Sequence, residues 1–296
     1  MSLVSALRSI ATHPLNRGGE LRSLVRFAKW QIESRLVRGA VVHDWIGGSR
    51  FLVRTGETGL TGNIYTGLHE FADMGYLLHV LRDSDLFVDV GANAGSYTIL
   101  ACAVVGARGY AFEPVPGTYD RLVENVLLNH VESRVTCLKV GVGNVEGVFS
   151  FTSGKDTENH VVISGEKDPD AIDVRMCTLD SVLGGESPAV AKIDVEGFET
   201  PVLEGAQKTL NKASLHSVIM ELNGSGSRYG YDESRILEMM SDHGFKAYSY
   251  APFDRSLIKL NEKSLASGNS LFIRDLSVVA ERLASAPKVR IFGKEF

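Results

Sequence analysis

A short apolar run that ends in an acidic residue and a glycine-rich loop constrains the fold of this chain more than any other segment. Residues 85–99 read Asp-Leu-Phe-Val-Asp-Val-Gly-Ala-Asn-Ala-Gly-Ser-Tyr-Thr-Ile. The run 86–90 has the composition of a buried parallel strand, apart from Asp89 near its end. Gly91 and Gly95 suit a tight loop, because glycine adopts backbone conformations closed to other residues and lets a ligand or helix approach the main chain. The segment therefore predicts a strand, a binding loop and a helix.

The spacing of the loop glycines separates two classes of ligand. The dinucleotide fingerprint has a second glycine two positions after the first, and here that position is Asn93. Glu113 ends the next apolar run, about 20 residues after Gly91, where an acid can accept hydrogen bonds from ribose hydroxyls. The pattern Asp-x-Gly-x-x-x-Gly resembles the first motif of Rossmann-like methyltransferases that use S-adenosylmethionine (SAM). The loop therefore favours SAM over NAD.

Composition limits the classes of partner. The 296 residues are 44% hydrophobic and 23% charged, which is ordinary for a globular protein with a sizeable core. The net charge is −5, although the first 40 residues carry seven basic and only two acidic side chains. A nucleic-acid binder is usually basic over its main domain, so no nucleic-acid partner is expected. Three widely spaced cysteines and the lack of an apolar leader or span predict a cytoplasmic protein with free thiols.

Alternating strand-like and helix-like segments predict an α/β fold with a doubly wound, mostly parallel sheet. After the loop, helices are expected at 116–129, 199–210 and 232–243, and strands at 135–140, 189–194, 216–221, 245–250 and 270–273. The segments 148–151, 160–163 and 172–177 are expected to form a β-rich insertion at an edge of the sheet or over the site. A helix over 67–82 and short hairpin strands around 41–42 and 51–53 should precede the core.

The N-terminal segment predicts a basic amphipathic helix over 18–38. Its apolar positions are Leu21, Leu24, Val25, Ala28, Ile32 and Leu36. They recur at spacings of three and four, with arginines on the other faces. A cap helix on the main domain with a solvated basic face is the favoured interpretation. A peripheral contact with an anionic membrane or with a partner protein stays open.

A second polar group follows the apolar run that begins at residue 189. The block Lys-Ile-Asp-Val-Glu-Gly-Phe-Glu at 192–199 places three carboxylates at the carboxyl end of a strand, which is the ligand edge of an open α/β sheet. Glu199 is expected to open the next helix, where the helix dipole favours an acid. Asp194 and Glu196 are therefore the candidate catalytic residues.

Four blocks together resemble the FkbM family of SAM-dependent methyltransferases. They are the segments 88–95, 112–114, 178–180 and 192–197. The resemblance implies a Rossmann-like sheet of the seven-stranded methyltransferase type. It also implies O-methylation of a small molecule, a sugar or glycan or a polyketide-type natural product. Under this interpretation residues 1–66 form a helical and hairpin extension, 67–275 the SAM-dependent methyltransferase domain, and 276–296 a C-terminal helix or tail.

The resemblance also assigns roles to single residues. The cofactor candidates are Asp89, Gly91, Asn93, Gly95, Glu113, Asn144, Tyr65 and Glu70. Glu113 is expected at the ribose hydroxyls and Asn144 near the adenine, while Asn125 is a candidate brace for the loop. His160 is the one histidine in the insertion, and it joins Asp194 and Glu196 as a candidate base, although a lone histidine is more often structural.

Methyl transfer to an alcohol oxygen requires alignment of the reactants and removal of the hydroxyl proton. A side chain can take the proton, or Mg²⁺ held by Asp194, Glu196 and Glu221 can acidify the hydroxyl. The spacing of these acids in the sequence does not choose between the two mechanisms. An NAD(P)-binding oxidoreductase and a catalytically silent SAM-binding scaffold are the rival functions; Asn93 argues against the first. The expected partner is a hydroxylated small molecule, and a homo-oligomer stays open.

Overall fold

The computed structural model describes residues 3–37, 39–54, 57, 59–154, 158–163, 168–261, 263–264 and 268–296. Its central sheet has eight strands in the order β12-β11-β13-β10-β9-β3-β4-β5. The bounds are β3 (Leu86–Val90), β4 (Arg108–Phe112), β5 (Val135–Leu138), β9 (Val190–Ile193), β10 (Ser217–Glu221), β11 (Lys246–Ala251), β12 (Ser256–Lys259) and β13 (Asn269–Ile273). Strands β5, β4, β3, β9 and β10 are parallel, and β13 runs antiparallel between β10 and β11. The predicted mostly parallel α/β sheet is confirmed, with β12 as an additional edge strand.

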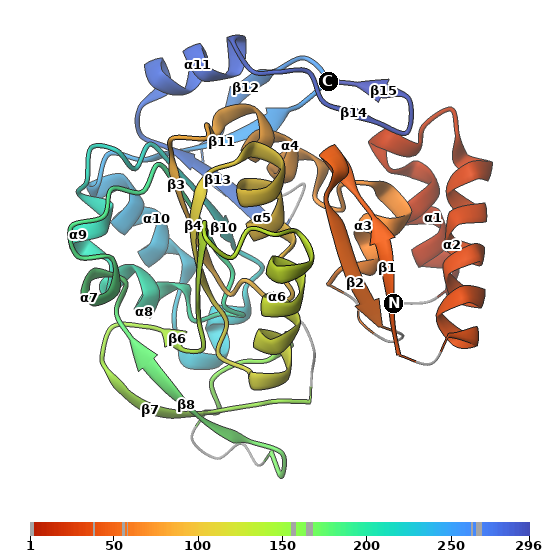
Figure 1. Ribbon diagram of the computed structural model, residues 1–296. Coiled ribbons are helices and arrows are strands. Elements are labelled where there is room, and N and C mark those ends of the chain that lie inside the picture. The colour runs from red at the N-terminus through yellow and green to blue at the C-terminus, as the bar shows by residue number, and fades with distance from the viewer. Residues whose placement is uncertain are drawn as a thin grey trace.

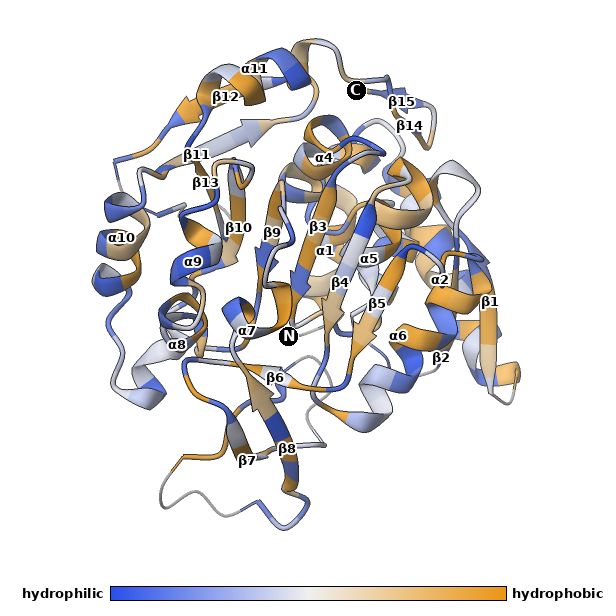
Figure 2. Cartoon of the chain, turned by 60° about the vertical axis from the view of Figure 1, so that its left-hand side comes forward, coloured by the Kyte–Doolittle hydropathy of each residue, from blue (hydrophilic) through white to orange (hydrophobic). Residues whose placement is uncertain are grey.

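Helices cover both faces of this sheet, as parallel strands require. The bounds are α4 (Phe71–Val80), α5 (Ser96–Ile99), the π-helix η3 (Leu100–Val105), α6 (Pro116–Leu128), α7 (Leu179–Leu183), α8 (Glu199–Glu204), α9 (Gln207–Leu210) and α10 (Glu233–Asp242). Phe87 and Val190 pack in the core cluster with α4 to α6, whereas Val88 and Ala191 pack in the cluster with α7 to α10. Figure 2 shows the apolar strands side by side between these layers.

The helix expected over 199–210 is two short helices instead of one. α8 ends at Glu204 and α9 begins at Gln207. Between them, a Cβ on Gly205 would lie 2.0 Å from the carbonyl oxygen of Gly143. The break lies where the backbone of the insertion, between β6 and β7, approaches the chain too closely for a side chain.

The N-terminal extension contains α1 (Leu3–Thr12), η1 (Pro14–Asn16), α2 (Glu20–Leu36), β1 (Ala40–Asp44), η2 (Ile46–Gly48), β2 (Arg50–Arg54) and α3 (Thr61–Thr66). β1 and β2 form the predicted hairpin, and α2 is the predicted basic helix, while α1 was not expected. The helix α2 does not pack through its apolar stripe: Leu21 and Leu36 are exposed, and Trp30 is buried instead. The face through which α2 packs is therefore not its apolar stripe.

The insertion forms a separate three-stranded sheet with the order β6-β8-β7, which extends beyond the carboxyl edge of the central sheet (Figure 1). Its strands are β6 (Gly141–Val142), β7 (Gly147–Phe151) and β8 (Ile172–Cys177). The strand expected at 160–163 is reduced to one bridge between Val161 and Phe151, and the neighbouring segments 155–157 and 164–167 lie outside the described residues. The insertion is fastened to the body by a small apolar cluster that includes Phe151, Val161 and Phe198.

The chain ends with α11 (Leu276–Ala284) and a small hairpin of β14 (Arg290–Ile291) and β15 (Lys294–Glu295). The hairpin lies beside the N-terminal extension (Figure 1), where the guanidinium of Arg26 lies 3.7 Å from the ring centroid of Phe292. Among the described residues, no helix combines the length and apolarity needed to cross a membrane.

Candidate active site

The carboxyl ends of β3, β4, β9 and β10 open into one cavity of about 1340 Å³. The start of α4 and the insertion complete its walls, the latter through residues such as Phe151 and Val161. Pockets for a single small ligand usually measure about 300 to 1,000 Å³. The cavity therefore has room for a cofactor together with a second molecule.

Asp89 lies near the end of β3, in the wall of this cavity, and is 2% exposed. The hydroxyl of Thr98 donates a hydrogen bond of 2.5 Å to its Oδ2 atom. Burial raises the pKa of Asp89 to about 6, although the hydrogen bond from Thr98 acts in the opposite direction. The side chain is thus a buried acceptor that helix α5 holds in place.

A hydrogen bond joins Asn93 and Glu113, the two residues that are predicted to lie close to the cofactor. Asn93 has a φ of 49°, a left-handed conformation that asparagine tolerates. Its backbone N–H donates to Glu113 Oε2, and the N–H of Val115 donates to Oε1, each over 3.0 Å. Burial raises the pKa of Glu113 to about 7. A carboxylate has about four acceptor positions, so Glu113 can still accept hydroxyls from a ligand.

The two loop glycines are required by protein packing. Gly91 has a φ of 80°, and a Cβ there would lie 1.8 Å from the carbonyl oxygen of Asp194. Gly95 has a φ of 94°, and its Cβ would lie 2.8 Å from Leu122 Cδ1 on α6. Gly91 lines the cavity, whereas Gly95 is not among the described residues that do. Direct contact of Gly95 with a cofactor thus stays a prediction without support from the geometry.

Of three further cofactor candidates, one lines the cavity and two do not. Glu70 lines the cavity and accepts a hydrogen bond of 2.8 Å from the hydroxyl of Tyr97. Tyr65 and Asn144 are not among the described residues that line it. Tyr65 instead packs on helix α2, where its hydroxyl accepts from Gln31 Nε2. The sequence misplaced Tyr65 because an isolated tyrosine carries no sign of which side of a helix it will occupy.

Asn144 and Asn125 have structural partners. Asn144 is exposed and donates to Glu204 Oε2 over 2.7 Å, on the outer side of α8. Asn125 is fully buried; its amide donates to the carbonyl of Ala94 and its Oδ1 accepts from the N–H of Leu52. Asn125 is therefore the predicted brace of the binding loop, whereas Asn144 contacts neither the loop nor the cavity.

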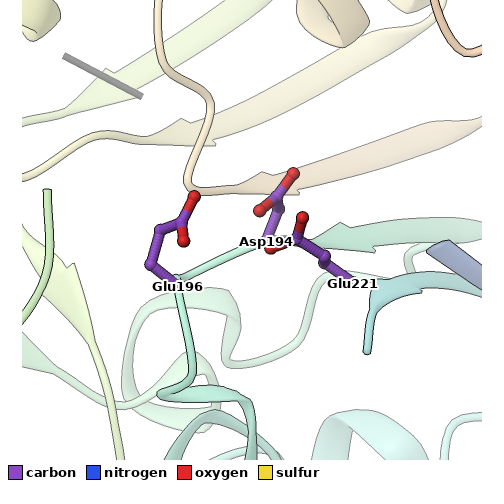
Figure 3. A group of neighbouring side chains, drawn as sticks. All are labelled: Asp194, Glu196 and Glu221. Carbon is purple, nitrogen blue, oxygen red and sulfur yellow. The ribbon is translucent and has the colours of Figure 1, made fainter. Parts of the chain in front are cut away.

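Asp194, Glu196 and Glu221 bring their carboxyl groups together at the opposite side of the cavity (Figure 3). Asp194 and Glu196 follow β9 and Glu221 ends β10, and one oxygen of each lies within 4.8 Å of the others. Burial and then the charge of Asp194 raise the pKa of Glu196 to about 7 and that of Glu221 to about 9. The cluster therefore holds at least one proton near neutral pH.

The backbone around Glu196 is held in an uncommon conformation. Glu196 has a φ of 54°, which is rare for residues other than glycine and asparagine and concentrates at functional sites. Glu199 opens α8, as predicted, and its Oε1 accepts from the N–H groups of Val195 and Gly197. A Cβ on Gly197 would lie 2.6 Å from the carbonyl of Ser225. These contacts fix the direction of the Glu196 side chain.

Lys192 is the site residue to which the sequence assigned no role. It is 1% exposed on β9. Its Nζ donates to Asp194 Oδ2 over 2.8 Å and to Asn269 Oδ1 over 3.1 Å, and lies 5.4 Å from the ring centroid of Tyr97. Burial alone would lower the pKa of Lys192, but the charges of Asp194 and Glu70 raise it above its usual value. A lysine inside an otherwise apolar strand was the available signal.

His160 and Arg228 line the cavity from the side of the insertion. His160 is 7% exposed, and its Nδ1 lies 2.9 Å from the carbonyl oxygen of Glu158. Arg228 is exposed and belongs to the 3₁₀ helix η5 (Ser225–Tyr229), which the hydroxyl of Tyr229 fastens to the carbonyl of Val161. The three predicted base candidates, His160, Asp194 and Glu196, thus line one cavity, and the guanidinium of Arg228 lines it as well.

Residues 89–247 match the family model described as the methyltransferase FkbM domain. The chain belongs to this family. Hexuronic acid methyltransferase AglP of Haloferax volcanii is 31% identical over 170 residues, which cover 56% of this chain and 65% of that protein. Methyltransferase sdnD of Sordaria araneosa is 28% identical over 209 residues, or 59% of this chain and 79% of that one. Among solved structures, P. horikoshii TYW2 in complex with MeSAdo has a TM-score of 0.44 and 14% identity, and covers 81% of this chain and 73% of that chain.

The FkbM domain contains both acidic groups of the cavity, from Asp89 to Glu221. It does not contain Glu70 or Asn269, which lie before and after the matched segment. Asn269 donates to Glu70 Oε1 over 2.5 Å and accepts from Lys192. In this FkbM protein, therefore, flanking segments supply part of the polar network behind the domain's acidic block.

Proposed function

We propose that this protein is a SAM-dependent O-methyltransferase that acts on a hydroxyl group of a small molecule, with a sugar or glycan as the first candidate acceptor and a polyketide-type natural product as the second. The observation that carries the proposal is the shared cavity: Asp89, Asn93 and Glu113 stand on one side and three clustered carboxyl groups on the other. Membership in the FkbM family supports methyl transfer over the rival oxidoreductase function.

The first side of the cavity fits SAM. Glu113 would bind the ribose hydroxyls through its free acceptor positions, and Asp89 and Asn93 would bound the methionine end. SAM supplies an activated methyl group when it is bound. The chain contributes the alignment of the reactants and the exclusion of water, which account for much of the acceleration in such transfers.

The second side of the cavity would accept the hydroxyl proton. Lys192 pairs with Asp194, and the pKa values of Glu196 and Glu221 are both raised, so we expect these two carboxyl groups to take up and release a proton at or above neutral pH. A general base is most effective when its pKa is near the working pH, and the pKa of Glu196 is raised to about 7. We therefore assign the proton transfer to Glu196, with Asp194 orienting the acceptor. His160 is the second candidate.

A separate observation supports a metal-dependent version of this proton transfer. The three carboxylate oxygens within 4.8 Å of one another are the hard donors that Mg²⁺ prefers. Such an ion would lower the pKa of the acceptor hydroxyl. Chelation decides between the versions: loss of turnover with EDTA and its return with Mg²⁺ favours the metal, and unchanged turnover favours Glu196 as a direct base.

The charge of Arg228 supports an acidic sugar as the acceptor. It is the one arginine among the described residues that line the cavity, it is exposed, and its charge acts on the carboxyl group of Glu196. A guanidinium binds a carboxylate with two parallel hydrogen bonds. AglP, the relative named as a hexuronic acid methyltransferase, acts on a sugar of this class, which agrees with the position of Arg228.

Two experiments test the proposal. Calorimetric titration with SAM and with NAD should show binding of SAM alone, and NAD binding would favour the oxidoreductase. Mass spectrometry after incubation with SAM and a glucuronic acid derivative, or with the matching glucose derivative, should show methylation of the acid first. Arg228→Gln should reduce this preference by about 1.5 to 3 kcal/mol, the size of a hydrogen bond to a charged group. SAM binding with no methylation of any acceptor would support the silent scaffold.

A further inference from the structure

Helix α2 presents an aligned apolar stripe to solvent. The stripe consists of Leu21, Val25, Ala28, Ile32 and Leu36, which fall on one face because their spacings are four, three, four and four. The side chains of Leu21, Val25, Ile32 and Leu36 are 76%, 58%, 60% and 77% exposed. Single exposed apolar residues are ordinary, whereas a contiguous row marks an interaction surface.

The opposite face of α2 is already used for packing. Ser23, Trp30 and Ser34 are buried there. Arg26 donates to the backbone carbonyl of Tyr65 over 3.0 Å, and the ring of Phe27 lies 5.0 Å from the ring of Tyr65. The helix is thus attached to α3 through one face, and α1 and α2 form an edge of the molecule (Figure 1). The α2 stripe cannot turn inward without breaking these contacts.

Basic side chains border the α2 stripe on both sides. Arg22 and Lys29 lie along one border and Arg35 along the other, and all three are exposed. The only acids on α2 are Glu20 and Glu33, and Glu33 pairs with Lys29 at 3.6 Å. The first 40 residues carry a net +5 although the whole chain carries −5. The charge of this edge is therefore opposite to that of the rest of the chain.

We propose that α2 lies in the surface of an anionic membrane, with the stripe at the boundary of the acyl chains and the basic borders at the headgroups. An apolar face between cationic borders is the arrangement of interfacial helices. The 17 residues of α2 extend along the surface and do not cross it. Because the remainder of the chain is acidic, the same headgroups repel it and orient the protein with α2 toward the lipid.

A second copy of the chain fits this surface less well. In a two-fold symmetric contact each patch meets its own copy. The borders formed by Arg22, Lys29 and Arg35 would then face the same cations, and Glu20, whose Oε1 already accepts from the N–H of Gly18, is the other acid on each helix besides the paired Glu33. Anionic lipid provides both the apolar layer and the opposite charge.

The test uses the full chain and vesicles of phosphatidylcholine, either alone or mixed equally with phosphatidylglycerol. In a flotation assay the wild type should bind the anionic vesicles and not the neutral ones, and added salt should weaken binding. Leu21→Ser/Ile32→Ser/Leu36→Ser should lower the partition coefficient by at least about tenfold, and Arg22→Gln/Lys29→Gln/Arg35→Gln should abolish the preference for anionic lipid. Leu127→Ser, at a leucine that is 52% exposed on α6, is the matched control and should bind like the wild type.

The substitutions are at exposed positions, so thermal unfolding and SAM affinity should be unchanged and report an intact fold. Equal binding of the wild type and the stripe variant, or no binding of the wild type to anionic vesicles, would overturn the proposal. If the wild type forms a dimer in ultracentrifugation and the stripe variant does not, the partner of the α2 stripe is a second copy of the chain and not lipid. None of these results depends on methyl transfer.

Discussion

Both sides of the cavity carry acids, which are buried on the β3 and β4 side and half-buried on the β9 and β10 side, and their hydrogen-bond partners differ. On the β3 and β4 side, Asp89 accepts from Thr98, and both oxygens of Glu113 accept backbone N–H groups. On the β9 and β10 side, Lys192 is the one cation that hydrogen-bonds within the acid cluster among the described residues, and Glu221 Oε2 is buried without a partner there. Hydrogen bonds within the protein therefore hold the acids of the first side in place, whereas the second side has the less satisfied carboxyl groups, to which we assign the proposed proton transfer.

This difference reflects how each group of acids is assembled. Asp89 lies on β3 and Glu113 directly follows β4, the adjacent parallel strand, and each acid meets a donor supplied by the loop or helix that follows its strand. Asp194 directly follows β9 and Glu221 ends β10, the strand adjacent to it. After β9, the N–H groups of Val195 and Gly197 donate to Glu199 instead. Substitutions on the two sides should therefore affect different steps.

The largest effect is expected on turnover. Asp194→Asn and Glu196→Gln keep the side-chain volume but remove the charge, so each should lower the methylation rate by about 10²- to 10⁴-fold, the usual contribution of a positioned acid or base. SAM affinity measured by calorimetry should change little. Glu238→Gln, on the exposed face of α10, serves as the control. Near-normal turnover in both variants would move proton transfer to His160.

The next effect separates the two loop glycines. Gly91→Ala should destabilise the protein by about 1 to 3 kcal/mol or more, because the new Cβ meets the backbone of Asp194. Gly95→Ala should cost less, since it meets the movable side chain of Leu122. Urea unfolding of both variants measures the difference. Equal stabilities would show that the loop at Gly91 can move away from the backbone of Asp194. The two sides of the cavity would then be less tightly packed against each other than the structure indicates.

A smaller effect is expected on cofactor affinity. Glu113→Gln retains one acceptor oxygen but loses the charge, and should weaken SAM binding by about 1.5 to 3 kcal/mol, with turnover at saturating SAM reduced far less. Glu113→Ala would also leave the N–H groups of Asn93 and Val115 unpaired, so it is the less specific variant. Calorimetry gives the affinity. An unchanged affinity for Glu113→Gln would remove Glu113 from the cofactor site.

The last effect is on the pH dependence of stability. The pKa of Glu221 is raised from 4.5 to about 9, so the folded state binds its proton more tightly than the unfolded state. The resulting stabilisation is complete below about pH 4.5 and is lost as the pH rises through about 9. Glu221→Gln should therefore flatten the decline in unfolding free energy with pH. A decline of equal slope in the variant would place the titration on other carboxyl groups.

Local patterns predicted most of the sheet and the local structure on the β3 and β4 side of the cavity. An apolar run, a glycine loop and an acid are close in sequence, so β3, its loop and Glu113 followed from the order of residues alone. The insertion strands β7 and β8 and the helix start at Glu199 followed in the same way. In each case the interaction that selects the structure lies within a short stretch of chain.

Tertiary structure decided the features that depend on distant neighbours. The pairing of β9 with β10 placed Glu221 beside Asp194, and the antiparallel strand β13 brought Asn269 to Lys192. The helical period of α2 showed that it has an apolar face, but Trp30 on the opposite side makes a second packable face. Periodicity identifies which side chains share a face. Which face is buried depends on the surface that meets it, and that surface is formed only when α3 folds against α2.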